Sequence, residues 1–323
     1  MNSSPRAGII PDPGARAFLA ATAWSAAACE PLTGDASARK YFRLRKDQKT
    51  AILMDASLVR ETVAPFLRLS QHLGQLGFSA PAILARDDAR GLLLLEDFGD
   101  ETFARRLEEP GRAEELYSLA TDVLIALHRH PRAVPEGLRA YHPEKMLEDV
   151  ELFLAGRTIS AAGRAEFQAA WREVLPAAHQ VPVSLLLRDY HVANLMWLPG
   201  REGIRQAGLL DFQDAYQGPV TYDLVSLLED ARRDVPDGVS EAMTARYRAQ
   251  FPALDRDVFE TSLAILAALR HTRVLAIFER LGRQEGKPEY RKLHSPRVER
   301  LLQRALRHPR LAGVKRWMKR YAG

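Results

Sequence analysis

Two patterns of hydrophobic residues divide the chain. In the first hundred positions, apolar residues come in short runs at 41–44, 50–54, 83–85 and 92–95, each bounded by polar turns. Short runs of this kind are typical of β-strands. Residues 59–76 instead carry apolar side chains at helical spacing, which predicts a helix between the two pairs of strands. We therefore expect a small lobe of four strands and one helix.

Helical spacing dominates the chain after Gly99. Apolar stripes lie within residues 116–127, 146–154, 167–178, 222–232, 258–281, 298–306 and 311–317. Short apolar runs interrupt the helices at 185–187, 195–198 and 208–210. We expect strands at these three places. The pattern predicts an α+β protein, with a small β-rich lobe at 1–97 and a larger, mainly helical lobe at 98–323.

Polar residues that suit phosphoryl transfer lie beside these three short runs. Asp189 follows the first run, Asn194 comes five positions later, and Asp211 ends the third run. Phosphoryl transfer needs an acid that accepts or orients a hydroxyl proton, and oxygen ligands for Mg²⁺. Asp-x4-Asn followed by Asp-Phe has the spacing of a kinase catalytic loop and metal loop. Asp189 is then the base, with Asn194 and Asp211 as metal ligands. Alternatively, Asp189 and Asn194 only cap turns.

Composition is that of a globular chain with a modest basic excess. The 323 residues include 46 Lys and Arg against 41 Asp and Glu, a formal net charge of +5. This excess suits an anionic ligand such as ATP and does not by itself indicate nucleic acid. Basic residues at 291–310 and 315–320 interleave with helical apolar spacing, which favours the polar faces of helices over a nucleic-acid surface.

The cysteine count and the N-terminal segment favour a cytoplasmic protein. Cys29 is the only cysteine, so neither an intramolecular disulfide nor a cysteine-based zinc site can form. No stretch approaches the ~20 apolar residues of a membrane span. Residues 17–29 resemble a secretion signal, but Asp12 and a weak positive start favour a helix with Phe18 and Cys29 on its small-residue face.

A turn of small residues precedes the strand expected at 41–44. Gly34 and Ser37 lie in it, and their backbone N–H groups could approach a phosphate. An ordinary surface hairpin explains the same residues.

The order of these motifs resembles that of the aminoglycoside phosphotransferase family, small-molecule kinases with a bilobal, protein-kinase-like fold. The resemblance is carried by residues 34–37, 93–99, 187–194 and 211–214. Longer phrases, among them GDASARKYFRL, LLLLEDFGD and LLDFQDAYQGPVTYDL, are similar to bacterial anomeric sugar kinases that act on N-acetylmuramate and N-acetylglucosamine.

This resemblance implies a reaction and a set of roles. The reaction is ATP-dependent phosphorylation of the anomeric hydroxyl of a sugar, which gives the 1-phosphate in peptidoglycan recycling. Asp189 would receive or orient the hydroxyl proton, while Asn194 and Asp211 would hold Mg²⁺.

The resemblance also implies a hinge on the adenine side, and it shows that the lysine of the third strand is missing. Backbone groups of Glu96, Asp97 and Phe98 would form the hinge. Protein kinases carry a lysine on the third strand, but residues 51–55 read AILMD and contain none. We expect Arg43 on the preceding strand to supply the positive charge; the alternative is a solvated strand arginine.

Other positions near the motifs keep two interpretations. Leu187 stands where these kinases usually have histidine, and Gln213 replaces the glycine after Asp-Phe, so a mobile switch is not expected. His191 could touch the substrate or orient its loop. Asp214 could bind sugar hydroxyls or Mg²⁺, or cap a turn. Asp223 lies at the start of an apolar helix. This position favours a role as an acid at the helix N-terminus or as an anchor for the 187–194 loop.

Two other functions remain open at this point. The acceptor could be an aminoglycoside, a choline-like alcohol or another sugar. Tyr290 and His271 could line the sugar pocket, although ordinary packing is favoured for each. A non-catalytic nucleotide-binding scaffold is the second, suggested by the missing strand lysine. The retained Asp189, Asn194 and Asp211 argue against it. The sequence leaves the oligomeric state undetermined.

Overall fold

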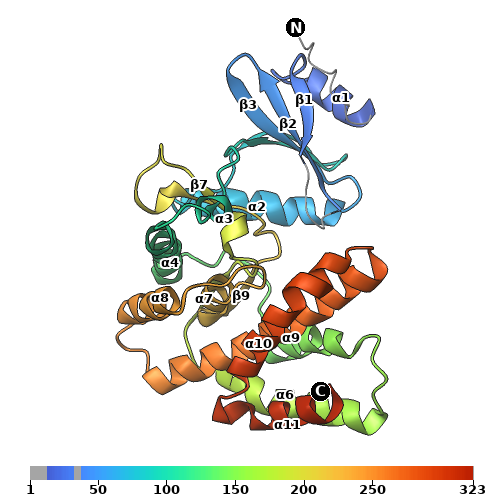
Figure 1. Cartoon of the computed structure of the whole chain (residues 1–323). Coiled ribbons are helices and arrows are strands. Elements are labelled where there is room, and N and C mark those ends of the chain that lie inside the picture. Colours follow the sequence, from blue (N-terminus) through green and yellow to red (C-terminus); the bar gives the residue numbers. More distant parts are fainter. Residues whose placement is uncertain (1–12, 33–37, 323) are drawn as a thin grey trace. The chain divides into compact units, whose positions relative to one another are not determined.

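Five strands form one antiparallel sheet in the N-terminal part of the chain. The computed structural model describes residues 13–32 and 38–322 (Figure 1). The strands are β1 Ala28–Leu32, β2 Lys40–Lys46, β3 Lys49–Asp55, β4 Ile83–Asp87 and β5 Leu92–Glu96, in the order β1-β2-β3-β5-β4. Asp47 turns the β2–β3 hairpin with a φ of 56°, a left-handed conformation that Asp tolerates better than most side chains.

The middle of β2 and the end of β3 are buried on both faces. Leu44, Ala51 and Leu53 are fully buried and pack with Phe18 and Leu19 of the N-terminal helix α1 Pro13–Ala20. A second helix of this region, α2 Val63–Gln75, buries a stripe of apolar residues at helical spacing. It follows a short 3₁₀ turn at Arg60–Thr62.

The N-terminal helix is shorter than the sequence suggests. It ends at Ala20, and Cys29 lies on β1 opposite Leu44 of β2, so the prediction of one helix reaching Cys29 is wrong. The Thr22 hydroxyl donates to the Leu19 carbonyl at 2.8 Å and accepts from the Trp24 amide. These local bonds compete with helix continuation.

Residues 194–214 group with the N-terminal strands. Together with the described residues up to Arg106 they form one of two compact units, and residues 107–193 and 215–322 form the other. The segment contains β7 Leu195–Trp197 and β8 Ala207–Leu209, a two-stranded antiparallel ladder, with a 3₁₀ turn at Gly203–Gln206 between them. The contiguous division at 97/98 expected from the sequence stays a prediction.

Backbone bonds and one aromatic pair tie this returning segment to the first unit. The Trp197 amide donates to the Glu101 carbonyl, just before helix α3 Phe103–Arg106, and the Leu209 amide donates to the Ser79 carbonyl at 2.7 Å. The rings of Phe66 and Phe212 stack with centroids 5.2 Å apart.

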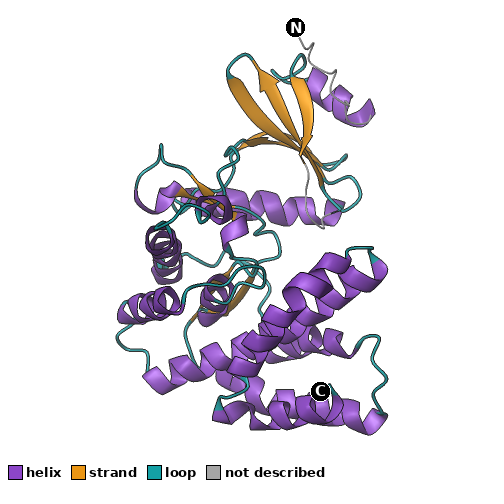
Figure 2. Ribbon diagram, in the orientation of Figure 1, coloured by secondary structure: helices purple, strands orange, loops and turns teal. Residues whose placement is uncertain are grey.

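The second unit is mainly helical (Figure 2). Its helices are α4 Ala113–Arg129, α5 Pro143–Glu151, α6 Ala161–Ala178, α7 Thr221–Leu228, α8 Asp237–Ala249, α9 Arg256–Gln284, α10 Ser295–Ala305 and α11 Ala312–Tyr321. Short 3₁₀ turns lie at Leu152–Leu154, Val192–Asn194 and Pro309–Leu311, and a π turn lies at Tyr290–His294. Strands β6 Val183–Leu186 and β9 Tyr216–Pro219 pair antiparallel.

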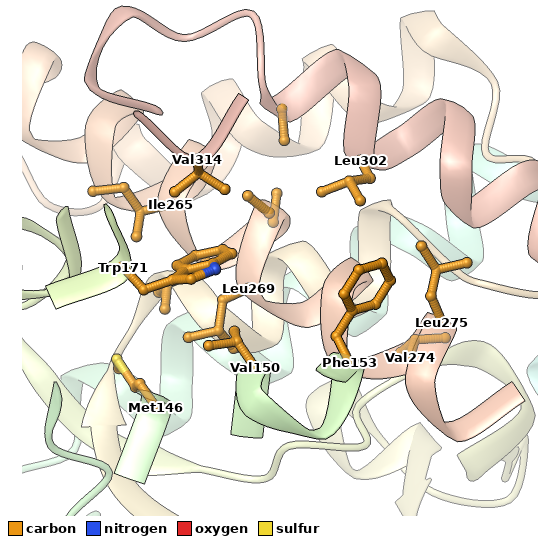
Figure 3. Packing of buried hydrophobic residues seen from close by; sticks show 14 of the residues in the cluster. Met146, Val150, Phe153, Trp171, Ile265, Leu269, Val274, Leu275, Leu302 and Val314 are labelled. Carbon is orange, nitrogen blue, oxygen red and sulfur yellow. The ribbon is translucent and has the colours of Figure 1, made fainter. Parts of the chain in front are cut away.

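Helix α9 supplies much of the core of the second unit. Leu269 of α9 is fully buried and belongs to one cluster with Trp171 of α6, Val150 of α5 and Leu302 of α10 (Figure 3). In the described part of the chain, the α9 stretch Arg256–Arg283 is long and apolar enough for a membrane span, but 67% of its most apolar window is buried. Its apolar residues are those of a core helix.

Candidate active site

The loop after β6, residues 187–191, is held by the first turn of α7. Asp223 accepts the backbone N–H of Leu187 at 2.6 Å and that of Arg188 at 2.8 Å. Its side chain is buried, with the residue 1% exposed. These contacts support the role of Asp223 as a loop anchor, because two oxygens fix two consecutive amides just before Asp189.

Opposing effects act on the pKa of Asp223. Burial raises this pKa to about 7, and the charge of Asp189 acts in the same direction, while the two amide donors and Arg270 oppose the rise. Both carboxyl oxygens accept N–H donors, an arrangement that suits the ionised form.

Arg188 holds the same loop through contacts of its guanidinium with other elements of the second unit. Its guanidinium donates to Asp149 of α5 at 2.5 Å and lies over the ring of Tyr216, 5.0 Å from the centroid. The Tyr141 hydroxyl also donates to Asp149, at 2.8 Å. Burial raises the pKa of Asp149, but Arg188 and Arg273 hold it below its ordinary value. Arg188 has a φ of 70°, so the backbone is strained immediately before Asp189.

Asp189 and His191 lie on this loop with different exposure. Asp189 is partly exposed, whereas His191 is 8% exposed and its Nε2 lies 3.4 Å from Arg232 Nη1. Burial lowers the pKa of His191, so its neutral form accepts from Arg232 at Nε2 and carries its proton on Nδ1. That Nδ1 has no hydrogen-bond partner within residues 13–32 and 38–322.

Asn194 and Asp211, the predicted metal ligands, come together in the first unit. The Leu210 amide donates to the Asn194 carbonyl at 3.0 Å, which places Asp211 beside the start of β7. The Asp211 side chain is 43% exposed, and its Oδ1 accepts from Gln213 at 2.9 Å. Asp189 belongs to the second unit. Asp214 follows as an exposed residue.

The residues around Asp211 fit a hard cation. Carboxylate and amide oxygens are suitable ligands for Mg²⁺, which binds through one or two carboxylates together with substrate phosphates. The buried Oε1 of Gln213 has no partner in the described structure. In the same residues, no group of three or more His, Cys, Asp and Glu could hold a metal. The arrangement therefore suits a metal that arrives with phosphates better than a dedicated metal cage.

Arg43 lies in an ion-pair network with the segment after β5. Its Nε is 2.7 Å from Asp97 and its Nη1 is 2.7 Å from Asp100, while its Nη2 donates to the Gly99 carbonyl at 3.0 Å. The residue is 5% exposed. Burial raises the pKa of Asp97, but Arg43 and the Gly99 amide hold it below its ordinary value. Two carboxylates thus match the Arg43 charge, and its role toward phosphate stays a prediction.

Arg39 is a second cation that the sequence reasoning missed. Its Nη2 donates to Asp211 Oδ1 at 3.2 Å. Tyr41 lies beside this pair, and burial raises its pKa. Arg39 lies just before β2 and is spaced by two from Tyr41 and Arg43, which alternation along β2 directs to one face. That spacing was the available signal.

The predicted hinge residues make specific contacts in the first unit. Glu96 pairs with Arg201, whose guanidinium lies 5.1 Å from the centre of the Phe98 ring. The Phe98 ring packs against Gly208, where an added Cβ would come within 2.8 Å of it. Adenine binding by this segment stays a prediction. The other predicted nucleotide contacts, Gly34 and Ser37, lie outside the described residues.

Comparisons with known proteins identify the family of the chain. The phosphotransferase enzyme family (APH) matches residues 28–260. The N-acetylmuramate/N-acetylglucosamine kinase of Caulobacter vibrioides is 35% identical over 347 residues, covering 94% of this chain and 95% of that protein. The protein of the same name from Pseudomonas aeruginosa is 33% identical over 297 residues, covering 87% of this chain and 85% of that protein.

Solved structures show the same fold at low sequence identity. A choline/ethanolamine kinase family protein from Mesorhizobium loti has a TM-score of 0.65 at 19% identity, over 93% of this chain and 98% of that chain. The streptomycin–ATP complex of APH(2")-IIa has a TM-score of 0.55 at 14% identity, over 76% of this chain and 84% of that chain. The predicted α+β, protein-kinase-like fold is confirmed. With the family match over most of its length, the chain belongs to the phosphotransferase enzyme family.

Proposed function

We propose that this protein transfers the γ-phosphoryl group of ATP to the anomeric hydroxyl of N-acetylmuramate and N-acetylglucosamine, giving the sugar 1-phosphates. The observation that carries the proposal is the anchored 187–191 loop, in which Asp223 and Asp149 hold the residues before Asp189. The relatives at 35% and 33% identity bear the names of kinases for these two sugars. Peptidoglycan recycling in the cytoplasm is the proposed setting.

Asp189 is the proposed base of the reaction. It accepts or orients the proton of the sugar hydroxyl, which attacks the γ-phosphorus as the bond to the ADP oxygen breaks. Asn194 and Asp211 would hold Mg²⁺, which neutralises charge on the phosphates when bound. His191 and Asp214 are proposed to face the sugar.

The nucleotide side is proposed to combine backbone contacts and arginine. Backbone groups of residues 96–98 would receive the adenine, and the 34–37 turn would approach the phosphates. Arg39 beside Asp211 supplies a cation near the proposed metal ligands. Arginine suits phosphate because its planar group can form two parallel hydrogen bonds.

The product assignment tests the proposal directly. The protein is incubated with ATP, Mg²⁺ and each amino sugar, and the product is identified by mass spectrometry and phosphorus NMR. We expect a phosphate on the anomeric oxygen. Folded protein that phosphorylates neither sugar, or phosphate on another hydroxyl, contradicts the proposed reaction.

Asp189→Asn tests the proposed base. General base catalysis typically contributes about 10²–10⁴-fold, so turnover should fall by that order while ATP still binds in calorimetry. Undiminished turnover would remove Asp189 from its role.

Another acceptor is the alternative within the same reaction class. The fold is shared with a choline/ethanolamine kinase family protein and with an aminoglycoside phosphotransferase. A panel of aminoglycosides, choline-like alcohols and sugars tests this alternative, with specificity compared as kcat/KM. Mg²⁺-ATP binding without transfer to any acceptor would favour a non-catalytic scaffold instead.

A further inference from the structure

Basic residues gather around the 187–191 loop in the second unit. His191 experiences the charges of Asp189, Asp230, Arg232 and Arg270. The charges of Asp189 and Arg270 also reach Asp223, where they act in opposite directions on its pKa. Two arginines, Arg232 after α7 and Arg270 on α9, therefore lie near His191 of this loop.

Arg270 is a buried cation without a carboxylate contact. It is 4% exposed, and Nη1 donates to the Glu229 carbonyl at 3.3 Å. In the described part of the chain, no carboxylate oxygen lies within 4 Å of its guanidinium. Buried charges in proteins are normally paired. Arg270 thus places a buried positive charge near His191 and Asp223.

Arg232 is the exposed member of the pair. Its Nη1 lies 3.4 Å from His191 Nε2, and its guanidinium carbon lies 5.8 Å from the centre of the Tyr290 ring. No ion pair of its side chain exists among the described residues. Its other donors can therefore receive an anion from solvent without breaking an existing pair.

Nearby acids are occupied by other groups. Glu229 binds His271 at 2.6 Å and Arg304 at 3.1 Å. Asp230 is buried and accepts the backbone N–H of Arg232 at 2.8 Å. Neither acid forms an ion pair with the guanidinium of Arg232 among the described residues.

The two sugars of the proposed function differ in charge. N-Acetylmuramate is N-acetylglucosamine with a lactyl ether on O3, and that ether ends in a carboxylate. An exposed arginine beside the loop of the base can bind a carboxylate through two N–H groups. N-Acetylglucosamine offers no such group.

We propose that Arg232 binds the carboxylate of an acidic amino sugar and thereby sets the preference for N-acetylmuramate over N-acetylglucosamine. The inference rests on the proposed function. Arg232 is a specificity residue that touches the substrate at a distance from the reacting hydroxyl.

Arg232→Gln tests the inference by comparing the two sugars. We expect kcat/KM for N-acetylmuramate to fall about 10–100-fold, as for loss of a charge-assisted bond. The value for N-acetylglucosamine should stay within about 2-fold, because uncharged contacts are kept. Arg232→Lys should give a kcat/KM for N-acetylmuramate between those of wild type and Arg232→Gln, because lysine keeps the charge but cannot form two parallel hydrogen bonds. Arg310→Gln, at another exposed arginine, is the matched control and should change neither sugar.

An equal fall for both sugars would overturn the inference, because it would assign Arg232 a structural role. Unchanged values for both sugars would overturn it as well. Calorimetric binding of each sugar to wild type and Arg232→Gln measures the same contrast without phosphoryl transfer. A wild-type protein that binds N-acetylmuramate through Arg232 but transfers no phosphate would refute the proposed function alone.

Discussion

At the scale of single residues, the site depends on charged side chains that fix backbone groups. Asp223 holds two consecutive amides, and Arg43 holds the 97–100 segment through two carboxylates and a carbonyl. Such groups act on function through position. Removing one leaves its buried partners unpaired, which costs more than the lost bond itself contributed.

Asp223→Ala is expected to reduce both turnover and stability. The Leu187 and Arg188 amides lose their acceptors, and each unsatisfied buried group costs about 1–3 kcal/mol. Asp189 then loses its fixed position, so kcat should fall by about 10²-fold or more. Steady-state kinetics and urea denaturation measure the two effects. A variant with normal kcat would show that the anchor does not position Asp189.

Arg39→Ala and Arg43→Ala should have different consequences. Arg39 donates to the partly exposed Asp211, so its loss should raise the KM for ATP about 10-fold with little change in stability. Arg43 and Asp97 are both buried, and breaking a buried pair costs about 3–5 kcal/mol. Thermal unfolding and ATP titrations distinguish them. If Arg43→Ala left ATP affinity and turnover unchanged, Arg43 would have no role toward phosphate.

At the scale of elements, helix α8 packs on α4 through polar as well as apolar contacts. His128 of α4 and the hydroxyl of Tyr247 of α8 lie 2.6 Å apart. Arg246 forms two bonds of 2.7 Å with Asp122 on the exposed side. The partly buried histidine makes this helix pair sensitive to acid, whereas the exposed ion pair contributes little to stability.

The α4–α8 pair should weaken as pH falls. Burial lowers the pKa of His128 to about 3 from its ordinary 6.5, so below pH 6.5 the unfolded chain binds a proton that the folded chain does not. The free energy of unfolding is therefore unaffected by His128 above pH 6.5. It falls progressively between pH 6.5 and pH 3, by at most about 1.4 kcal/mol per pH unit.

His128→Gln keeps a hydrogen-bonding group toward Tyr247 and removes the titration. The melting temperature of this variant should fall less than that of wild type between pH 7 and pH 5. Other buried histidines titrate in both proteins, so the difference between the two slopes isolates His128. Identical slopes would mean that His128 is protonated without cost in the folded state.

At the scale of the whole molecule, each of the two units is built from segments that are far apart in the sequence. Residues 194–214 return to the N-terminal sheet region, and α9 gathers α5, α6 and α10 around its buried face. The stability of the second unit therefore depends on contacts between segments far apart in sequence. Its core is continuous across these helices (Figure 3).

Leu269→Ala should destabilise this core strongly. The side chain is fully buried, and Leu→Ala changes in cores cost about 2–5 kcal/mol through lost transfer energy and the cavity left behind. Leu152→Ala, at a residue that is half exposed, is the matched control and should cost about 0.5 kcal/mol or less. Urea denaturation compares them. Equal effects would contradict the assignment of Leu269 to the core.

Much of the local structure follows from the sequence. Short apolar runs and helical spacing predicted the strands β2 to β5 and the long helices, because side-chain periodicity depends only on neighbouring residues. Asp-x4-Asn and Asp-Phe, with the phrases around them, indicated the phosphotransferase family, which the family match confirms; the roles of their residues stay predictions. Side-chain spacing alone predicted that α1 reaches Cys29, because it contains no information on the pairing of Cys29 with β2.

The tertiary structure decided which partners these residues have. Asp223 meets the amide of Leu187 across 36 positions, Arg43 meets Asp97 across 54, and Arg39 meets Asp211 across 172. Periodicity carries no information over such separations, because only chain folding brings those segments together. The sequence by itself therefore determined most of the elements and the order of the motifs. Three-dimensional packing determined which charged side chains are paired and which, as at Arg232, contact a neutral group instead.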